Sequence, residues 1–137
     1  MKEQKSAKGE FNMEISAVKD CELERYITDI MLDIGVPAHL RGYHYIRDAI
    51  LLSGRDVEMV SSVTKLLYPV IAKRFKTTDQ KVERAIRNAI EVSWNRGNKK
   101  TFEKMFGYSV LNGRGRPTNS EYIARIADKV RLDIKAM

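Results

Sequence analysis

Five long polar side chains lie close together in one short stretch of the chain, at Gln80, Lys81, Glu83, Arg84 and Arg87. Each type matches part of a nucleic-acid base edge: arginine and lysine can pair with guanine, glutamine with adenine, and glutamate can accept from cytosine. Residues advance by about 100° each around an α-helix, so these positions fall mostly on one side of such a helix. The stretch is therefore a candidate for contacting base edges.

The opposite side of the same helix is apolar. Val82, Ile86 and Ile90 recur at helical spacing, and the small residues Ala85, Ala89 and Ser93 fill the positions between them. This pattern predicts a two-faced helix over residues 79–94 that stops at Arg96 and Gly97. An exposed helix with an ordinary Glu83–Arg87 ion pair would have the same spacing, so the pattern alone leaves both interpretations open.

A short helix and a turn precede this amphipathic helix. Ala72 is small enough for close helix packing, and Ile71 and Phe75 supply apolar surface beneath the turn. The sequence therefore predicts a helix-turn-helix over residues 69–96. Lys76 stands where glycine would be common, and we expect a longer turn that avoids the left-handed backbone conformation.

The rest of the chain is patterned for helices as well, and no segment alternates with a period of two for long enough to indicate a strand. The predicted class is all-α. Small and polar residues mark the helix ends. The first helix stops at Gly35 and the second at Ser53 and Gly54, and Thr118 or Asn119 caps the start of the last. We expect a linker or tail at residues 1–20 and one domain at 21–137. The predicted helices are 22–34, 40–52, 57–67, 70–75, 79–96, 100–106 and one from about 119.

Positive charge is concentrated in one part of the sequence. Residues 64–116 hold thirteen Lys and Arg against four acids, whereas the remaining residues hold twelve against fourteen. A concentrated basic surface suits a polyanion, because binding releases counterions from phosphates. Double-stranded DNA is the favoured partner, and a basic helical module that binds RNA or another protein is the alternative.

Other classes of function find little support. Cys21 is the only cysteine and His39 and His44 are the only histidines, so we expect no metal site and no disulfide. No phosphate loop or nucleophile–base pair indicates an enzyme, a cofactor or a small-molecule substrate. No apolar run is long enough to span a membrane, and the first residues lack the apolar core of a secretory signal. We expect a cytoplasmic protein.

Several blocks together resemble a known family, the effector domain of stage zero sporulation protein A, a response regulator of endospore formation. The resemblance runs from about Leu23 to the C-terminus. The blocks are GVPAHLRGY at 35–43, LYP at 67–69, IAKRF at 71–75, VERAIR at 82–87, WNRGN at 94–98, FGY at 106–108 and RPTNSE at 116–121.

The resemblance implies a six-helix DNA-binding domain that activates or represses sporulation genes. It implies binding to a short asymmetric box, a second copy in tandem on an adjacent box, and contact with a sigma subunit of RNA polymerase. By position, Lys81, Glu83, Arg84 and Arg87 would contact bases and backbone. Lys81 stands where family members can have arginine, which removes a bidentate fork. Residues 95–108 would face the polymerase, with Arg96, Lys99, Glu103 and Lys104 as the contacts.

Full-length regulators of this kind begin with a receiver domain. The residues before Glu22 are too few to form one, so we expect an isolated effector domain that binds DNA without phosphorylation.

Backbone phosphates would be contacted from several segments around the recognition helix. His39 and Arg41 begin a helix, whose free N–H groups favour anions. The loop from Gly113 to Arg116 could contact phosphate or enter the minor groove. The expected phosphate contacts are His39, Arg41, Thr77, Thr78, Lys100, Arg114 and Arg116.

Overall fold

The computed structural model describes residues 19–107 and 115–136, and every regular element among them is helical. Seven are α-helices and one is a π-helical segment, so the all-α class is confirmed for this part of the chain, whereas the expected number of six helices is not. In order they are α2 (Asp20–Asp33), α3 (Arg41–Arg55), α4 (Glu58–Ser61), η1 (Val63–Leu67), α5 (Tyr68–Arg74), α6 (Asp79–Arg96), α7 (Lys99–Phe106) and α9 (Asn119–Ala136).

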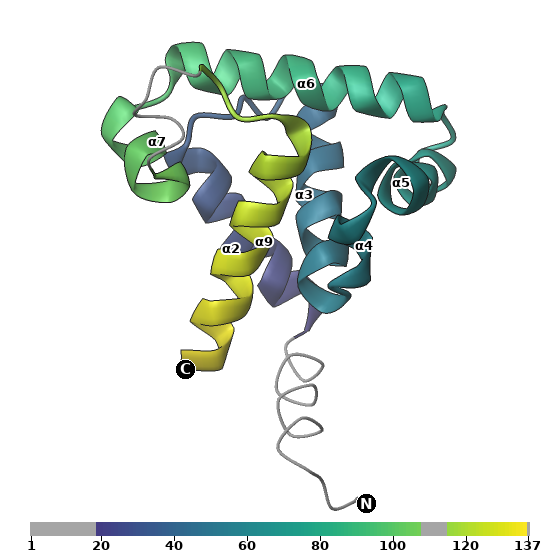
Figure 1. The fold of residues 1–137 in the computed structure, drawn as a ribbon, viewed down its shortest axis with the longest axis horizontal. Helices are drawn as coiled ribbons and strands as arrows, with labels where there is room; N and C mark the ends of the chain where they lie inside the picture. The colour runs from purple at the N-terminus through teal and green to yellow at the C-terminus, as the bar shows by residue number, and fades with distance from the viewer. Residues whose placement is uncertain (1–18, 108–114, 137) are drawn as a thin grey trace, which may run out of the picture.

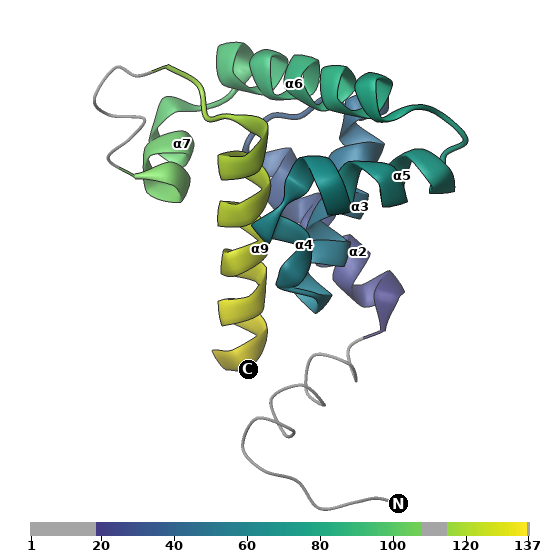
Figure 2. The same ribbon diagram turned by 45° about the vertical axis from the view of Figure 1, so that its right-hand side comes forward.

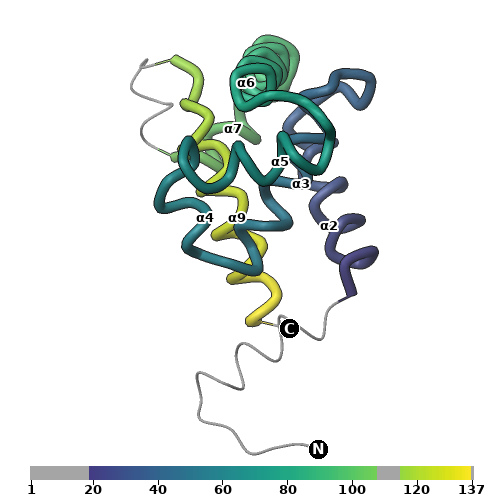
Figure 3. Tube along the Cα trace, turned by 90° about the vertical axis from the view of Figure 1, so that its right-hand side faces the viewer, coloured from purple at the N-terminus to yellow at the C-terminus, as the bar shows by residue number. Residues whose placement is uncertain are grey.

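Helix α3 is the centre of the arrangement, because it packs against α2, α6 and α9. Helix α6 crosses one end of this group (Figure 1), and α5 lies beneath its N-terminal half (Figure 2). When the molecule is viewed almost along α6, helices α4, α5 and α9 lie below it (Figure 3). The core between the helices is apolar, and its largest fully buried side chains include Tyr122, Phe102, Met31, Ile46 and Ile86.

Two helix ends close with the same backbone motif but with different residues. After α2, Gly35 has φ 77°, its N–H bonds to Leu32, and the N–H of Val36 bonds to Met31. After α5, Lys76 has φ 55°, and the N–H of Thr77 bonds to the carbonyl of Ala72 at 2.8 Å. Both are Schellman ends, in which the residue after the cap takes the left-handed conformation.

The expectation for Lys76 was therefore wrong. The turn between α5 and α6 does use the left-handed conformation, and a lysine adopts it. The closing bond from Thr77 to Ala72 requires that backbone geometry, so the packing of the two helices overrides the local preference for glycine.

Two other expected boundaries also differ. Helix α3 continues through Ser53 and Gly54 to Arg55, because both residues are buried and the carbonyl of Ser53 accepts from Arg131 of α9 at 3.0 Å. The single helix expected at 57–67 is interrupted at Ser62, whose φ of −150° is not helical, and it resumes as η1. Asp56 does not cap this helix, because the N-cap residue of α4 is Val57, which makes no side-chain cap bond; the carboxylate of Asp56 only accepts the N–H of Glu58 at 3.0 Å.

The last helix begins with a reciprocal cap. Thr118 Oγ1 accepts from the N–H of Glu121 at 3.2 Å, and the carboxylate of Glu121 accepts from the N–H of Thr118 at 2.9 Å. This capping box identifies Thr118 as the cap and holds the first turn of α9 in place.

Candidate nucleic-acid interface

Helix α6 has one buried and one exposed face, as its sequence predicts. The buried residues are Val82, Ile86, Ala89, Ile90 and Ser93. Gln80, Lys81, Arg84, Arg87 and Asn88 are exposed, and Glu83 is half-buried. The helix begins sharply because Thr78 Oγ1 accepts the N–H of Lys81 at 3.3 Å. The five candidate base-contacting residues therefore lie in the first half of a capped, well-packed helix.

A groove runs along one flank of this helix, between α6 and the start of α3. It has a volume of about 590 Å³ and is lined by Arg41, Tyr45, Thr77, Lys81, Arg84, Ala85 and Asn88. Two of the expected phosphate contacts, Arg41 and Thr77, thus share a surface with two expected base contacts. The groove holds three cationic side chains and no acid, which gives this flank a positive potential.

A second groove, of about 460 Å³, lies on the other flank, between α6, η1 and the start of α9. Its lining includes Glu83 and Arg87 from α6, together with Arg116 and Thr118 from the segment that leads into α9. Arg116 is exposed. The structure therefore brings residues from three distant parts of the sequence to the two sides of one helix.

Glu83 and Arg87 form an ion pair across one turn of α6. Their side chains are 36% and 49% exposed, so the pair is open to solvent and contributes little to stability. The ordinary Glu83–Arg87 ion pair that the spacing allows is thus present in the free protein. For Arg87 to contact a base, its guanidinium must either leave Glu83 or keep the ion pair with Glu83 while it binds the base.

The remaining expected phosphate contacts lie elsewhere. His39 is exposed in the segment before α3 and lines neither groove, and Lys100 lies in the first turn of α7. The hydroxyl of Thr78 is used in capping α6. Gly113 and Arg114 lie outside the described residues, as does Tyr108 at the end of the expected polymerase surface.

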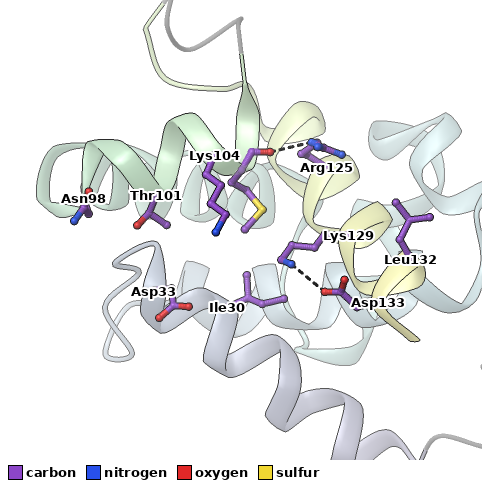
Figure 4. Close-up of a pocket in the computed structure, with 10 residues that line it drawn as sticks. Ile30, Asp33, Asn98, Thr101, Lys104, Arg125, Lys129, Leu132 and Asp133 are labelled. Atoms are coloured by element: carbon purple, nitrogen blue, oxygen red, sulfur yellow. Dashed lines mark hydrogen bonds and ion pairs between the residues drawn. The ribbon is translucent and has the colours of Figure 1, made fainter. Parts of the chain in front are cut away.

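The expected polymerase contacts lie at the far end of α6 and on α7. Arg96, Lys99, Glu103 and Lys104 are all exposed. Lys104 also lines a pocket of about 540 Å³ between α2, α7 and α9, which contains Asp33 and Asp133 as well (Figure 4). There Lys129 pairs with Asp133 at 2.9 Å, and Arg125 donates to the carbonyl of Met105. This pocket has mixed charge and does not include any of the expected base-contacting residues.

Gly42 is a structural residue of the interface that the sequence reasoning missed. A Cβ atom at Gly42 would lie 2.1 Å from the carbonyl oxygen of Ala85 and 2.7 Å from the Cβ of Ala89. Backbone and small side chains meet here, so α3 and α6 are too close together for a side chain at position 42. A glycine inside an amphipathic helix was the signal that could have found it.

Two polar residues that line the second groove, Tyr68 and Asn119, are held in place by a hydrogen bond to each other. Tyr68 is buried, and burial raises the pKa of its hydroxyl. Asn119 Nδ2 donates to that hydroxyl at 2.9 Å and to the backbone carbonyl of Glu83 at 3.1 Å. Asn119 is therefore a second residue near the site that periodicity could not identify.

Within the described ranges, no cluster of three His, Cys, Asp or Glu side chains is placed to hold a metal ion. No helix of the same ranges combines the length and the hydropathy needed to cross a bilayer. The only cysteine in the sequence, Cys21, is exposed and reduced.

Together these features define a class of protein. It is an all-helical domain in which the exposed polar face of α6 is flanked by grooves that contain cationic side chains, a surface suited to nucleic acid. A family model described as "Sporulation initiation factor Spo0A C terminal" matches residues 27–130, most of the chain. The chain belongs to this family. It is a DNA-binding domain that regulates the transcription of sporulation genes, in a response-regulator system, and its role is regulatory and not catalytic.

Proposed function

We propose that this domain binds duplex DNA sequence-specifically by placing α6 in the major groove, with α5 and α6 acting as a helix-turn-helix. The observation that carries the proposal is the position of the two grooves. Exposed hydrogen-bonding side chains lie along α6 between them, and Arg41 and Arg116 stand on opposite flanks. A major groove is about 12 Å wide and bounded by two phosphate strands, so cations on both sides of a helix fit it.

In this arrangement Gln80, Lys81, Glu83, Arg84 and Arg87 contact bases. Arg84 is exposed beside Lys81 in the first groove, and its planar fork suits the two acceptors of guanine. Lys81 offers a single ammonium, which contributes charge with less geometric selectivity. Glu83 and Arg87 act as a pair, in which glutamate orients the guanidinium or accepts from cytosine. The phosphate contacts are Arg41, Thr77 and Arg116, with His39, Thr78, Lys100 and Arg114 as further candidates.

A second copy on an adjacent box follows from the small size of one reading surface. Residues 80–87 span about 12 Å of helix, which corresponds to roughly three or four base pairs. So short a site recurs very often in a genome, and two copies in tandem would multiply the selectivity. Titration of a one-box and a two-box duplex would test this, and equal affinity per box with no cooperativity would contradict it.

Contact with a sigma subunit of RNA polymerase is the third part of the proposal. Arg96 lies twelve residues beyond Arg84, which is about 18 Å along the helix, so a protein there would not compete with DNA. Lys99, Glu103 and Lys104 extend this surface along α7. Depending on where a box lies, such a contact would help or obstruct the polymerase, and the domain would activate or repress.

The test of base contact compares three single substitutions, each of which removes one arginine charge. The probes are a duplex selected from a random library by the unaltered chain, and a random duplex. Arg84→Ala should weaken the selected duplex by about 1–3 kcal/mol more than the random one. Arg116→Ala should weaken both alike and lower the salt slope by about one. Arg25→Ala, on α2, is the control that should change neither. Equal losses on both duplexes for Arg84→Ala would contradict the proposal.

A further inference from the structure

Asn119 connects the helix that contacts DNA to two other elements. Its side-chain amide Nδ2 donates to the hydroxyl of Tyr68 in α5 at 2.9 Å and to the backbone carbonyl of Glu83 in α6 at 3.1 Å. Asn119 itself is the first residue of α9 and is half-buried. One amide group, which has two N–H donors, thus joins three helices.

The acceptor on α6, the backbone carbonyl of Glu83, lies in the turn that carries the candidate base contacts, so a small movement of this turn would change how they meet the bases. Glu83 lies in the middle of residues 80–87, and its carbonyl also accepts the helical N–H of Arg87 in an α-helix. A hydrogen bond to this carbonyl from another helix fixes the height and rotation of α6 at the turn that carries Glu83, Arg84 and Arg87. Base contacts tolerate displacements of only about half an ångström.

The anchor itself is held firmly. The capping box between Thr118 and Glu121 fixes the first turn of α9 on both sides of Asn119. Tyr68, the other acceptor, is only 4% exposed, so it cannot follow a displaced amide. The geometry also requires an amide: aspartate has the same shape but would turn acceptors toward the carbonyl of Glu83.

A second connection between α6 and the rest of the domain lies ten residues further along. Ser93 Oγ donates to the carbonyl of Ile34 at 2.5 Å and lies 3.2 Å from the hydroxyl of Tyr122 in α9. Ten residues correspond to about 15 Å of helix. The polar connection at Ser93 fixes the end of α6 that faces α7, whereas Asn119 fixes the end that carries the candidate base contacts.

We propose that Asn119 is a positioning residue for DNA recognition, which sets the orientation of the first half of α6 and so the sequence preference, without contacting a base. This inference rests on the proposed function of α6. If Asn119 has this role, its substitution should lower the ratio of the affinities for the selected and the random duplex. The fall in this ratio should be larger than for another substitution that lowers the melting temperature by as much.

The experiment compares Asn119→Ala with Ser93→Ala in the chain of residues 1–137. Each variant removes a side-chain hydrogen-bonding group that connects α6 to other elements. Ser93 is fully buried and Asn119 is half-buried, so the melting temperature should fall at least as far for Ser93→Ala as for Asn119→Ala. Affinities are measured for the selected and the random duplex at one salt concentration, below the melting range. Asn119→Ala should lower the selected-to-random affinity ratio by about tenfold, with an unchanged salt slope. Ser93→Ala should keep the ratio within about a factor of two.

A DNA-free measurement supports the comparison. Asn119→Ala should shift the backbone amide resonances of residues 80–87 more than those of residues 92–96, and Ser93→Ala should do the reverse. If Asn119→Ala does not fold, Asn119→Asp replaces it. This variant keeps the shape and removes the donors but adds a negative charge, so only its selected-to-random affinity ratio, and not its salt slope, is compared with the parent.

The possible failures are distinguishable. If the unaltered chain prefers its selected duplex but Asn119→Ala keeps that preference, or if Ser93→Ala loses it equally, the positioning role is wrong and the proposed function stands. If the unaltered chain shows no preference between duplexes, both are overturned.

Discussion

Substitution of Gly42 by alanine should displace α6 without altering any residue on it. The added Cβ would lie 2.1 Å from the carbonyl oxygen of Ala85 and 2.7 Å from the Cβ of Ala89. Neither atom can move by rotating a side chain, because one is backbone and the other is attached directly to it. Since non-bonded heavy atoms need about 3.5 Å, α6 and α3 must separate by about 1 Å.

The cost follows from this separation. Overpacking of a buried helix contact costs about 1–3 kcal/mol, which in a domain of this size lowers the melting temperature by roughly 4–12 °C. A shift of about 1 Å would also move Arg84 away from Arg41 across the first groove. We therefore expect the affinity for the selected duplex to fall at least about tenfold, while random DNA, which needs only charge, is bound about as before.

Gly54 supplies a matched control in the same helix. A Cβ atom there would meet only Val130, at 4.0 Å, which is ordinary contact. Gly54→Ala should therefore keep the preference for the selected duplex and raise stability by about 0.5–1 kcal/mol, because alanine is favoured over glycine inside helices.

The assays are thermal unfolding by circular dichroism and titration of the selected and random duplexes by fluorescence anisotropy. If Gly42→Ala melted within about 1 °C of the parent and still distinguished the two duplexes, the contact at Gly42 would not set the position of α6. The same conclusion would follow if Gly54→Ala were as damaging as Gly42→Ala, because the effect would then not depend on the contact with α6.

Three further results are expected. Lys76→Gly should stabilise the protein by about 0.5–1 kcal/mol in urea unfolding, because glycine takes the left-handed conformation without strain; a loss of stability would contradict the assignment of this turn. The hydrogen bond from Tyr26 lowers the pKa of Asp133, so this contribution to stability is present above about pH 4 and is lost as pH falls further. The difference in melting temperature between parent and Tyr26→Phe should accordingly be small but measurable at pH 6 and become smaller as pH falls below about 4; a difference that did not depend on pH would show that the bond has another role. Ile86→Asp should abolish cooperative unfolding, because it places an unpaired charge in a fully buried position.

Much of the fold follows from local pattern. The start, end and buried face of α6 are all predictable, because a capping threonine, a terminal glycine and an apolar stripe agree with one another. The class and most helices are predictable for the same reason. The errors lie where distant residues decide the outcome: Ser53 and Gly54 stay inside α3 because they pack against α9, and Lys76 takes a glycine-like conformation because the turn must close.

In the candidate site, too, the sequence predicts the features of one helix but not which other segments lie beside it. Side chains on α6 could be assigned to a face by counting residues, since the helix has a fixed period. Periodicity carries no information about which other segment lies beside that face. The nearness of Arg41 to Lys81 depends on the close packing at Gly42, and the nearness of Arg116 to Arg87 depends on how Asn119 holds the start of α9.

If α6 contacts base edges in the major groove, chemical modification of those edges must interfere with binding, and a methylation-interference experiment can measure this. Guanines in the selected duplex are methylated at N7, an acceptor that faces the major groove, and binding by the parent and by Arg84→Ala is compared. We expect methylation of particular guanines to block binding by the parent. Arg84→Ala should become insensitive to methylation at one of these guanines while remaining sensitive at the others. An identical interference pattern for both proteins, or interference only from adenine N3 in the minor groove, would contradict major-groove contact by α6.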